Sequence, residues 1–580
     1  MTSTLLRTGP LRLRWLGRVG YEEASDLQHV IRDSRTGDYL LLLEHPPVYT
    51  LGVRARPEHL LASIHESGAQ ICKADRGGDV TYHGPGQLVG YPVLDVPVGP
   101  GSVPSFVHRI EQLVIDVLAD LGLPGAGRLD RYPGVWVGAE SGSPRKICAI
   151  GVRVDRGRSM HGFALNVDPD LSMFDHIIPC GIPDKAVTSM AAEGLRVSMR
   201  QVVQAVSARA AAAFSFGDAL GRELEQQEAS WRTPVPVSPA VPLPLPGGEA
   251  LPRATSPSRA RTVTEDGRPG PAPTALERRL RGAGVDPATG IAFRDRKPDF
   301  VLAPVRIGPD VLRLRSMMRG LGLVTVCEEA GCPNLSECWA DGTATFMING
   351  ERCTRACGFC LVDTRRPLPL EASEPEHVAD AVAQMGLAHA VVTAVARDDL
   401  ADGGAAAFAR TIAAIRSRVP GTTVEVLIPD CKGDPASLRT IFDARPDVLN
   451  HNIETVLRLQ RAVRPSASYA RSLTVLGRAK RAGLVTKSGL ILGMGETRSE
   501  VLATLSDLRA VGVDIVTIGQ YLRPSQRHLP VMRWWTPAEF EEIGAAARAI
   551  GFSHVEASPL TRSSYHARRA VAEASARAGG

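Results

Sequence analysis

Six of the 10 cysteines in this 580-residue chain lie within 34 residues, in two sets of three. The first set has four and then five residues between its members, and the second has three and then two. The sets are Cys327, Cys332 and Cys338, then Cys353, Cys357 and Cys360. Clustered thiols of this kind indicate metal binding, and iron–sulfur clusters normally take four protein ligands each. Each set therefore lacks one ligand.

The second set, in the motif 353-CTRACGFC-360, can wrap three corners of a [4Fe–4S] cube. Three thiolates on one loop leave the fourth iron without a protein ligand, and an open iron can bind a substrate or cofactor directly. A structural zinc site is the alternative, but such sites are normally closed by four ligands. The spacing therefore favours an iron–sulfur cluster with one open iron.

The elements that must position these cysteines are alternating strands and helices. Alternation of this kind predicts a parallel sheet in a full or partial β/α barrel, whose chemistry lies in the loops after the strands. The second cysteine set follows the first expected strand. Strands are expected at 344–348, 389–395, 423–429, 447–454, 486–494, 514–522 and 553–558, separated by helices such as 403–419 and 499–512.

Polar residues end one of these strands, where side chains of a barrel usually face the active site. We therefore expect Asn450, Asn452 and Glu454 to contact a cofactor. The turn 493-GMGET-497 is either part of a nucleoside site or a plain strand-to-helix turn. Cys431 is interpreted as a packed thiol rather than a ligand.

A proline-rich stretch from about residue 230 to 275 interrupts the chain. It has no apolar periodicity, which is typical of a semi-rigid linker. The sequence therefore predicts a two-domain α/β protein, with domains at 1–228 and 276–580 and a linker at 229–275. Length alone already favours more than one domain.

The N-terminal domain mixes strand-like and helical patterns, which predicts a mixed α/β domain. Strands are expected at 39–45, 88–96 and 147–154, and helices at 105–122 and 198–214.

Charge and hydropathy exclude several functions. The 67 basic and 62 acidic residues give a net charge of +5, too small to argue for nucleic-acid binding. No apolar run reaches the roughly 18–20 residues of a membrane helix, and the N-terminus lacks the pattern of a signal peptide. We expect a cytoplasmic protein with no nucleic-acid or membrane partner, since metal-binding thiols suit a reducing compartment.

The C-terminal domain resembles lipoyl synthase, a member of the radical S-adenosylmethionine superfamily. The resemblance rests on both cysteine motifs and on 450-NHNIETV-456, 486-TKSGLILGMGET-497, 516-VTIGQYLRPSQRHLPV-531 and 562-RSSYHA-567. It implies a partial β/α (TIM-like) barrel of the radical-SAM type. It also implies that S-adenosyl-L-methionine binds the open iron at Cys353, Cys357 and Cys360 and is cleaved to a 5′-deoxyadenosyl radical.

The same resemblance implies a second, auxiliary [4Fe–4S] cluster on Cys327, Cys332 and Cys338. Its fourth ligand would be a serine of the RSSY motif, Ser564, with Ser563 as the alternative. In the family this cluster is consumed to supply two sulfur atoms. An electron donor such as ferredoxin or flavodoxin is implied as a partner.

A glycine-rich stretch in the N-terminal domain, 76-RGGDVTYHGPGQLVGYP-92, is dense in Arg, His and Tyr. Glycines let the backbone approach a ligand closely. With 145-RKICAIGVRV-154, 160-MHGFALNV-167 and 178-IPCGI-182 it resembles lipoyl(octanoyl) transferase. That resemblance implies a fold similar to lipoate and biotin protein ligases.

It further implies that Cys180 is the acyl-accepting nucleophile and Lys146 its partner. A thiolate is the reactive form of cysteine, so a neighbouring group must favour deprotonation. Cys72 and Cys148 are interpreted as structural. The implied substrate-binding residues are Arg76, Gly77, Gly78, Asp79, Val80, Thr81, Tyr82, His83, Ala149, Ile150, Gly151, Gly162, Phe163 and Ala164.

Together the two resemblances imply a bifunctional enzyme of lipoate biosynthesis. The first half would move an octanoyl group from octanoyl-acyl carrier protein to a lysine of a lipoyl domain, in 2-oxoacid dehydrogenases or the glycine cleavage H protein. The second half would insert sulfur at carbons six and eight. Two alternatives remain for the N-terminal half: an ATP-dependent lipoate ligase, or a docking module for lipoyl domains. The linker is expected to raise the local concentration of one site's product at the other.

Overall fold

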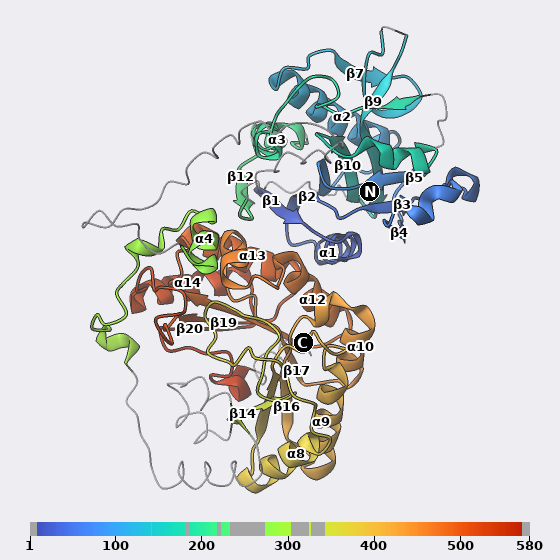
Figure 1. Ribbon diagram of the computed structural model, residues 1–580. Helices are drawn as coiled ribbons and strands as arrows, with labels where there is room; N and C mark the ends of the chain where they lie inside the picture. Colours follow the sequence, from blue (N-terminus) through green and yellow to red (C-terminus); the bar gives the residue numbers. More distant parts are fainter. Residues whose placement is uncertain are drawn as a thin grey trace, which may run out of the picture.

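The computed structural model describes residues 9–140, 142–179, 185–216, 222–231, 273–302, 324–325 and 343–570. Figure 1 shows an N-terminal domain stacked on a C-terminal one. Four predicted site residues lie outside the described residues: Cys180, Cys327, Cys332 and Cys338. Within the described part of the chain, no helix is long and apolar enough to cross a membrane.

The N-terminal domain is built on a mixed sheet in the order β12-β1-β2-β6-β10-β9-β8-β7, with β11 paired to β9. A second small sheet has the order β4-β3-β5. Helices α2 and α3 pack on one another and close the core over the large sheet. The strands of the large sheet are β1 (Leu11–Arg18), β2 (Asp38–Glu44), β6 (Gln87–Val93), β7 (Ala126–Leu129), β8 (Tyr132–Val137), β9 (Arg145–Asp155), β10 (Arg158–Asn166), β11 (Ala186–Val187) and β12 (Leu224–Glu228).

The remaining elements of this domain are β3 (Val48–Leu51), β4 (Gln70–Lys73), β5 (Val80–His83), α1 (Tyr21–Ser34), α2 (Ser102–Asp120) and α3 (Met199–Ala213). The strands predicted near 39–45, 88–96 and 147–154 and the two predicted helices are confirmed as β2, β6, β9, α2 and α3. β2 contains four consecutive leucines, and both of its faces are buried. Leu40 and Leu42 lie in the core formed with α2 and α3, and Leu41 and Leu43 lie in the core formed with α1 and the C-terminal domain.

The C-terminal domain is a single sheet in the order β13-β14-β15-β16-β17-β18-β19-β20, parallel from β14 to β20. Among the described strands the sheet does not close, so the structure is a partial barrel, as the sequence predicts. Its strands are β13 (Val324–Thr325), β14 (Thr343–Ile348), β15 (His389–Ala394), β16 (Thr423–Leu427), β17 (Val448–Asn450), β18 (Thr486–Leu492), β19 (Ile515–Gln520) and β20 (His554–Ala557).

Helices cover the outside of this partial barrel (Figure 1). Several begin with a Ser or Thr cap whose side chain accepts a hydrogen bond from the first turn, which fixes where each helix starts. The helices are α4 (Ala275–Gly282), α8 (Glu374–Met385), α9 (Ala405–Arg418), α10 (Pro435–Asp443), α11 (Gln460–Val463), α12 (Tyr469–Arg481), α13 (Arg498–Ala510) and α14 (Pro537–Ile550).

The predicted linker at 229–275 is bounded by packed residues on both sides. Trp231 stacks on Trp15 of β1, with ring centroids 4.6 Å apart, so the N-terminal domain extends a few residues past the predicted boundary. On the other side, Thr274 caps α4 with a capping box to Glu277. The residues between, 232–272, lie outside the described chain.

The two domains contact each other through helices α1 and α12. Val30 of α1 faces Gly477 of α12, where an added Cβ would lie 2.6 Å from the valine methyls. Glycine at this position therefore allows the helices to approach closely. Asp26 of α1 pairs with Arg478 on the same face of α12.

A buried cluster of polar side chains crosses the same interface. Arg14 of β1 donates through Nε to both oxygens of Asp507 of α13, at 3.0 and 2.9 Å. The hydroxyls of Tyr39 and Tyr469 donate to the same carboxylate, at 3.2 and 2.9 Å. The Arg14 side chain is 1% exposed and that of Asp507 3%. A buried charge is tolerated only when it is paired, so each domain supplies what the other needs.

We expect the two domains to stay together when the chain between them is cut. A protease site placed between residues 232 and 272 should give two fragments that co-elute in size-exclusion chromatography. Arg14→Met leaves Asp507 buried without its ion pair, which should weaken the association by about 3–5 kcal/mol and separate the fragments. Arg209→Met, which removes an exposed pair to Asp120, is the control and should leave co-elution intact. If the two fragments separate after cleavage of the chain that carries neither substitution, the interface between the domains is not fixed.

Candidate functional site

A cavity of about 450 Å³ lies at the carboxyl ends of the parallel strands in the C-terminal domain. The loop 353–360, which we call the cluster loop, contributes Cys353, Cys357 and Cys360 to its wall. Strand-end residues from across the barrel contribute the rest, including Asn452, Glu454 and Ser564. The parallel sheet therefore brings together residues that are more than two hundred positions apart in the sequence.

The cluster loop is held by hydrogen bonds at both ends and in its middle. Cys353 N donates to Asp363 O at 2.8 Å, and Gly358 N donates to Val463 O at 2.8 Å. His528 Nε2 donates to Cys360 O at 2.9 Å. Gly358 also packs so closely on Leu529 that an added Cβ would lie 2.9 Å from its side chain. The loop is therefore shaped by neighbours before any ligand binds.

The residues around the three cysteines fit an iron–sulfur cluster and a ligand with hydrogen-bond donors. Arg355 N donates to Cys353 Sγ at 3.4 Å, the type of contact that supports a metal-bound thiolate. Asn452 Oδ1 is buried beside the cavity and has no hydrogen-bond partner among the described residues, so it can accept from a bound amino or hydroxyl group. Glu454 is half-buried in the same wall, and its partial removal from solvent raises its pKa.

Burial also raises the pKa of the Cys357 thiol to about 12, and its two neighbouring cysteines add to this shift. Within the described residues no three His, Cys, Asp or Glu side chains converge on a point that would hold one metal ion. A cube binds each thiolate at a different iron, so its ligands surround a volume instead of meeting at one point. The cavity wall offers that arrangement, and cluster binding would stabilise the thiolates.

Two of the predicted cofactor residues line this cavity and one does not. Asn452 and Glu454 are in its wall, whereas the Asn450 side chain points into the barrel interior. There its Nδ2 donates to Glu425 Oε1 at 2.9 Å, and Lys487 Nζ lies 3.0 Å from the same carboxylate. The expectation that Asn450 contacts a cofactor is therefore corrected: it supports a buried ion pair within the barrel core. Asn450 is the last residue of β17, whereas Asn452 lies two residues beyond the strand, in the loop that borders the cavity.

The structure adds residues that the sequence did not single out. Arg464 lines the cavity and donates through Nη1 to the carbonyls of Asn452 and Ile453, at 3.0 and 3.2 Å. Arg355, inside the cluster loop, pairs with Asp398 and Asp430. Arg355 falls in 353-CTRACGFC-360, and the other three fall in 397-RDDLADGGA-405, 425-EVLIPD-430 and 460-QRAVRP-465, stretches that carry several charged residues. The charged residues of these stretches were the signal in the sequence that could have identified these positions.

The N-terminal domain has a smaller cavity of about 50 Å³. It lies between the glycine-rich loop after β4, strand β5 and the paired strands β9 and β10. Arg76 is anchored beside it, because its Nη2 donates to Thr50 O and Oγ1 at 2.7 and 2.8 Å. The predicted residues in its wall are Arg76, Gly77, Gly78, Asp79, Thr81, His83, Ala149, Ile150, Gly151, Gly162, Phe163 and Ala164.

Two predicted substrate residues, Val80 and Tyr82, do not face this cavity. They alternate along β5 with Thr81 and His83, which do. Their side chains pack instead with Tyr49 and other apolar residues on the opposite face. Because successive side chains of a strand point to opposite faces, the side chains of Val80 and Tyr82 belong to the core, and contact with a substrate would have to use their backbone.

His83 is held in a defined orientation. Its Nδ1 donates to Gln87 Oε1 at 2.7 Å, and burial lowers its pKa well below the usual value, so the ring is neutral at pH 7. Tyr21, Tyr91 and His161 also line the cavity, although none of them was among the predicted site residues. Tyr21 comes from the first turn of α1, and its buried hydroxyl has no hydrogen-bond partner within the described structure.

Lys146 lies on β9, three residues before the cavity residue Ala149, and is not itself in the cavity wall. Its ammonium lies 4.7 Å from the ring centroid of Trp136. The described residues just after Cys180 approach it: Val187 of β11 pairs with Lys146, and Thr188 N donates to Lys146 O at 2.9 Å. Cys72, Cys148 and Cys431 are buried among apolar residues, as expected of structural thiols.

In comparisons with known proteins, the two parts of the chain match different families. Residues 21–211 match the family model of the lipoyl protein ligase A/B catalytic domain, and residues 347–508 match that of the radical SAM superfamily. The lipoyl synthase of Rubrobacter xylanophilus is 56% identical over 283 residues, which are 48% of this chain and 88% of the relative. That of Kineococcus radiotolerans is 53% identical over 285 residues, 49% of this chain and 86% of the relative.

Among solved structures, a bi-partite lipoate protein ligase and its E2 lipoyl domain from Thermoplasma acidophilum align at 18% identity. That alignment covers 35% of this chain and 84% of the other, with a TM-score of 0.30.

We expect acid to destabilise the C-terminal domain through His451. This ring donates from Nδ1 to Ile428 O and accepts at Nε2 from Ser472; burial, with a contribution from Arg464, lowers its pKa to about 4. Below the unfolded value of about 6.5 only the unfolded chain gains this proton, so stability falls by about 2 kcal/mol from pH 7 to pH 5. Urea unfolding at both pH values should show a smaller pH effect in His451→Gln.

The exposed His377 is the matched control, and His377→Gln should keep the full pH effect. An equal pH effect in wild type and His451→Gln would show that His451 does not carry it.

Proposed function

Through its C-terminal part this chain belongs to the lipoyl synthase family, and we propose that it carries out two consecutive steps of lipoate formation. The match to a lipoyl protein ligase A/B catalytic domain places the N-terminal part in the same biosynthesis. The observation that carries the proposal is that each domain gathers predicted site residues around its own cavity. The chain is an enzyme with lipoate ligase or transferase character in its first domain and sulfur insertion in its second.

In the first step, we propose, the Cys180 thiolate attacks the carbonyl carbon of an octanoyl thioester on acyl carrier protein. The carrier's thiol leaves and an acyl-enzyme remains. The amine of a lipoyl-domain lysine then attacks, an amide forms and the cysteine is released. Lys146 would accept the thiol proton and return it, since it pairs with the strand that follows Cys180.

The N-terminal cavity suits an acyl chain because its walls are mostly backbone, glycine and apolar side chains. Gly151 allows the backbone of the glycine-rich loop to lie against β9, since an added Cβ would be 2.8 Å from Gly77 O. Neutral His83 and the anchored Arg76 offer polar contacts to the thioester end. The lipoyl domain is proposed as the acceptor.

In the second domain, Cys353, Cys357 and Cys360 would hold a [4Fe–4S] cluster whose open iron takes S-adenosyl-L-methionine. When bound, that pair supplies the radical that activates an otherwise unreactive C–H bond. Asn452 would accept from the cofactor and Glu454 would bind its polar groups, while Arg464 keeps their backbone in place. The large apolar share of the wall would exclude water from the reactive carbon.

A second cluster is proposed on Cys327, Cys332 and Cys338, with serine as its fourth ligand. Ser563 and Ser564 both line the C-terminal cavity. Ser563 Oγ already accepts from Asn452 Nδ2 at 2.7 Å, which favours Ser564 as the ligand. Serine is a harder ligand than thiolate, so this iron would be the most readily released. Ferredoxin or flavodoxin is the proposed electron donor.

We expect Cys180→Ser to abolish octanoyl transfer without ATP. Wild-type protein with octanoyl-acyl carrier protein should form an acyl thioester visible by mass spectrometry, and then an octanoylated lipoyl domain. Lys146→Met should slow transfer by about 10²–10⁴-fold, because it removes the proton acceptor. Cys72→Ala, which removes a buried thiol elsewhere in the domain, should keep transfer.

An absolute need for ATP with free octanoate would instead favour a lipoate ligase. Unchanged transfer in Cys180→Ser would contradict Cys180 as the nucleophile, whereas a wild-type domain that forms no acyl thioester and transfers nothing would favour the docking-module alternative.

Iron and acid-labile sulfide should reach about eight irons per chain after anaerobic reconstitution, as two cubes require. Replacing Cys353, Cys357 and Cys360 together by alanine should leave about four. Ser564→Ala should release iron from the remaining cluster faster than wild type, whereas the matched Ser563→Ala should not. About four irons in the wild type would contradict the auxiliary cluster.

A further inference from the structure

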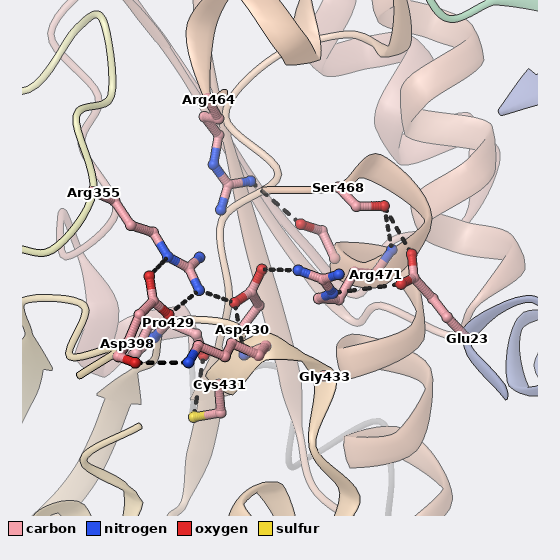
Figure 2. Close-up of polar contacts among 12 residues, drawn as sticks. Glu23, Arg355, Asp398, Pro429, Asp430, Cys431, Gly433, Arg464, Ser468 and Arg471 are labelled. Atoms are coloured by element: carbon pink, nitrogen blue, oxygen red, sulfur yellow. Dashed lines mark hydrogen bonds and ion pairs between the residues drawn. The ribbon is translucent and has the colours of Figure 1, made fainter. Parts of the chain in front are cut away.

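Helix α1 of the N-terminal domain reaches toward the cluster loop of the C-terminal domain through a line of charged side chains (Figure 2). The line begins at Glu23, in the first turn of α1. Ser468, which caps α12, donates to Glu23 Oε1 at 2.7 Å, and Thr474 Oγ1 donates to Glu23 O at 3.2 Å. Arg471 Nε lies 3.4 Å from Glu23 Oε2. Glu23 is therefore bound to one turn of α12.

Arg471 is shared between the two domains. While its Nε faces Glu23, its Nη1 lies 3.5 Å from Asp430 Oδ2. Asp430 follows β16 and is completely buried, and its other oxygen accepts from Arg355 Nη2 at 2.5 Å. A buried carboxylate needs its positive partners, so the positions of Arg471 and Arg355 depend on each other.

Arg355 is the end of the line and belongs to the cluster loop. Its Nε and Nη2 donate to the two oxygens of Asp398, at 2.7 and 2.8 Å, in addition to the bond with Asp430. Its side chain is 7% exposed. Its backbone N donates to Cys353 Sγ. Arg355 therefore joins the charged line through its side chain and a proposed cluster ligand through its backbone.

The charges alternate along the whole line: Glu23 negative, Arg471 positive, Asp430 negative, Arg355 positive and Asp398 negative. Removing the first charge leaves Arg471 with Asp430 as its only anion in this line. Arg471 then attracts the Asp430 carboxylate more strongly, so the ion pair between Asp430 and Arg355 weakens. The effect is transmitted through contacts, with no need for α1 to touch the cavity.

We propose that Glu23 of the N-terminal domain is a positioning residue for the cluster loop, acting through Arg471, Asp430 and Arg355. The role of that loop in holding a cluster rests on the proposed function. The consequence is that docking of the first domain tunes the site of the second. Reduction potentials of iron–sulfur clusters depend on hydrogen bonds to their sulfurs, so the effect should reach the cluster itself.

Asp26 provides a matched control, because it lies one helical turn from Glu23 on the same interface. It pairs with Arg478 of α12 and makes no contact with Arg471, Asp430 or Arg355 in the described structure. Asp26→Asn and Glu23→Gln each remove one interfacial carboxylate and keep the side chain's shape. Glu23→Gln also keeps an oxygen that can accept from Ser468.

The first measurement is hydrogen–deuterium exchange of the full chain without cluster or cofactor. Glu23→Gln should speed exchange about threefold in peptides covering 353–360, a change within the usual range of coupling free energies between distant sites. Asp26→Asn should leave the exchange of these peptides unchanged. In an Arg471→Met background, Glu23→Gln should have no further effect, since the connection is already broken. Equal exchange of the cluster loop in both single variants, or additive effects in the double variant, would overturn the proposal.

The second measurement uses the reconstituted full chain and follows the reduced cluster by electron paramagnetic resonance. The midpoint potential of the cluster on Cys353, Cys357 and Cys360 should shift to lower values in Glu23→Gln, because the bond to Cys353 Sγ weakens, and stay unchanged in Asp26→Asn. An unshifted potential would overturn the proposal. A wild-type chain that binds no cluster would count against the proposed function, and the exchange experiment would still decide the role of Glu23.

Discussion

The carboxylate of Asp507 is the point on which the arrangement of this molecule depends. It lies in a helix of the C-terminal domain and accepts from Arg14 and Tyr39 of the N-terminal sheet as well as from Tyr469 of its own domain. Three donors around one buried carboxylate fix direction as well as distance. Everything else at the interface, from the contact of Val30 with Gly477 to the ion pairs of α1, follows from that alignment.

Helix α1 serves both domains because its faces differ. Tyr21 in its first turn lines the N-terminal cavity, while Glu23, Asp26 and Val30 face α12. The same rigid element is thus part of one site and in charged contact with the support of the other. Helical spacing makes this possible, since residues three and four apart share a face and their neighbours do not.

The sequence predicted the secondary structure and domain order well, because alternation and proline content are local signals. All seven expected strands of the barrel are present as β14 to β20, within a few residues at their ends. It also located most residues of the N-terminal cavity through the glycine-rich motifs, and the cysteines of the C-terminal cavity through their spacing. The side chains of Val80 and Tyr82 lie in the core because a strand divides its side chains between two faces. The Asn450 side chain instead pairs with Glu425 inside the barrel, a contact that no local pattern marks.

What the sequence could not predict depends on contacts between distant parts of the chain. Nothing local marks Arg14 or Asp507 as partners, since they are 493 positions apart and each resembles an ordinary surface charge. Tyr21 and His161 enter the N-terminal cavity only because α1 and β10 meet there. The charged line from Glu23 to Arg355 likewise needs both domains in place before it exists.

Gly477 has a consequence for how related chains can be compared. Because glycine has no side chain, Val30 of α1 can pack directly against the backbone of α12 at this position. A larger residue there would hold the helices apart and prevent the charged groups on either side from meeting. In a chain that carries only the barrel, the residue at the position of Gly477 on α12 would therefore indicate whether a separate N-terminal partner can pack closely against that helix.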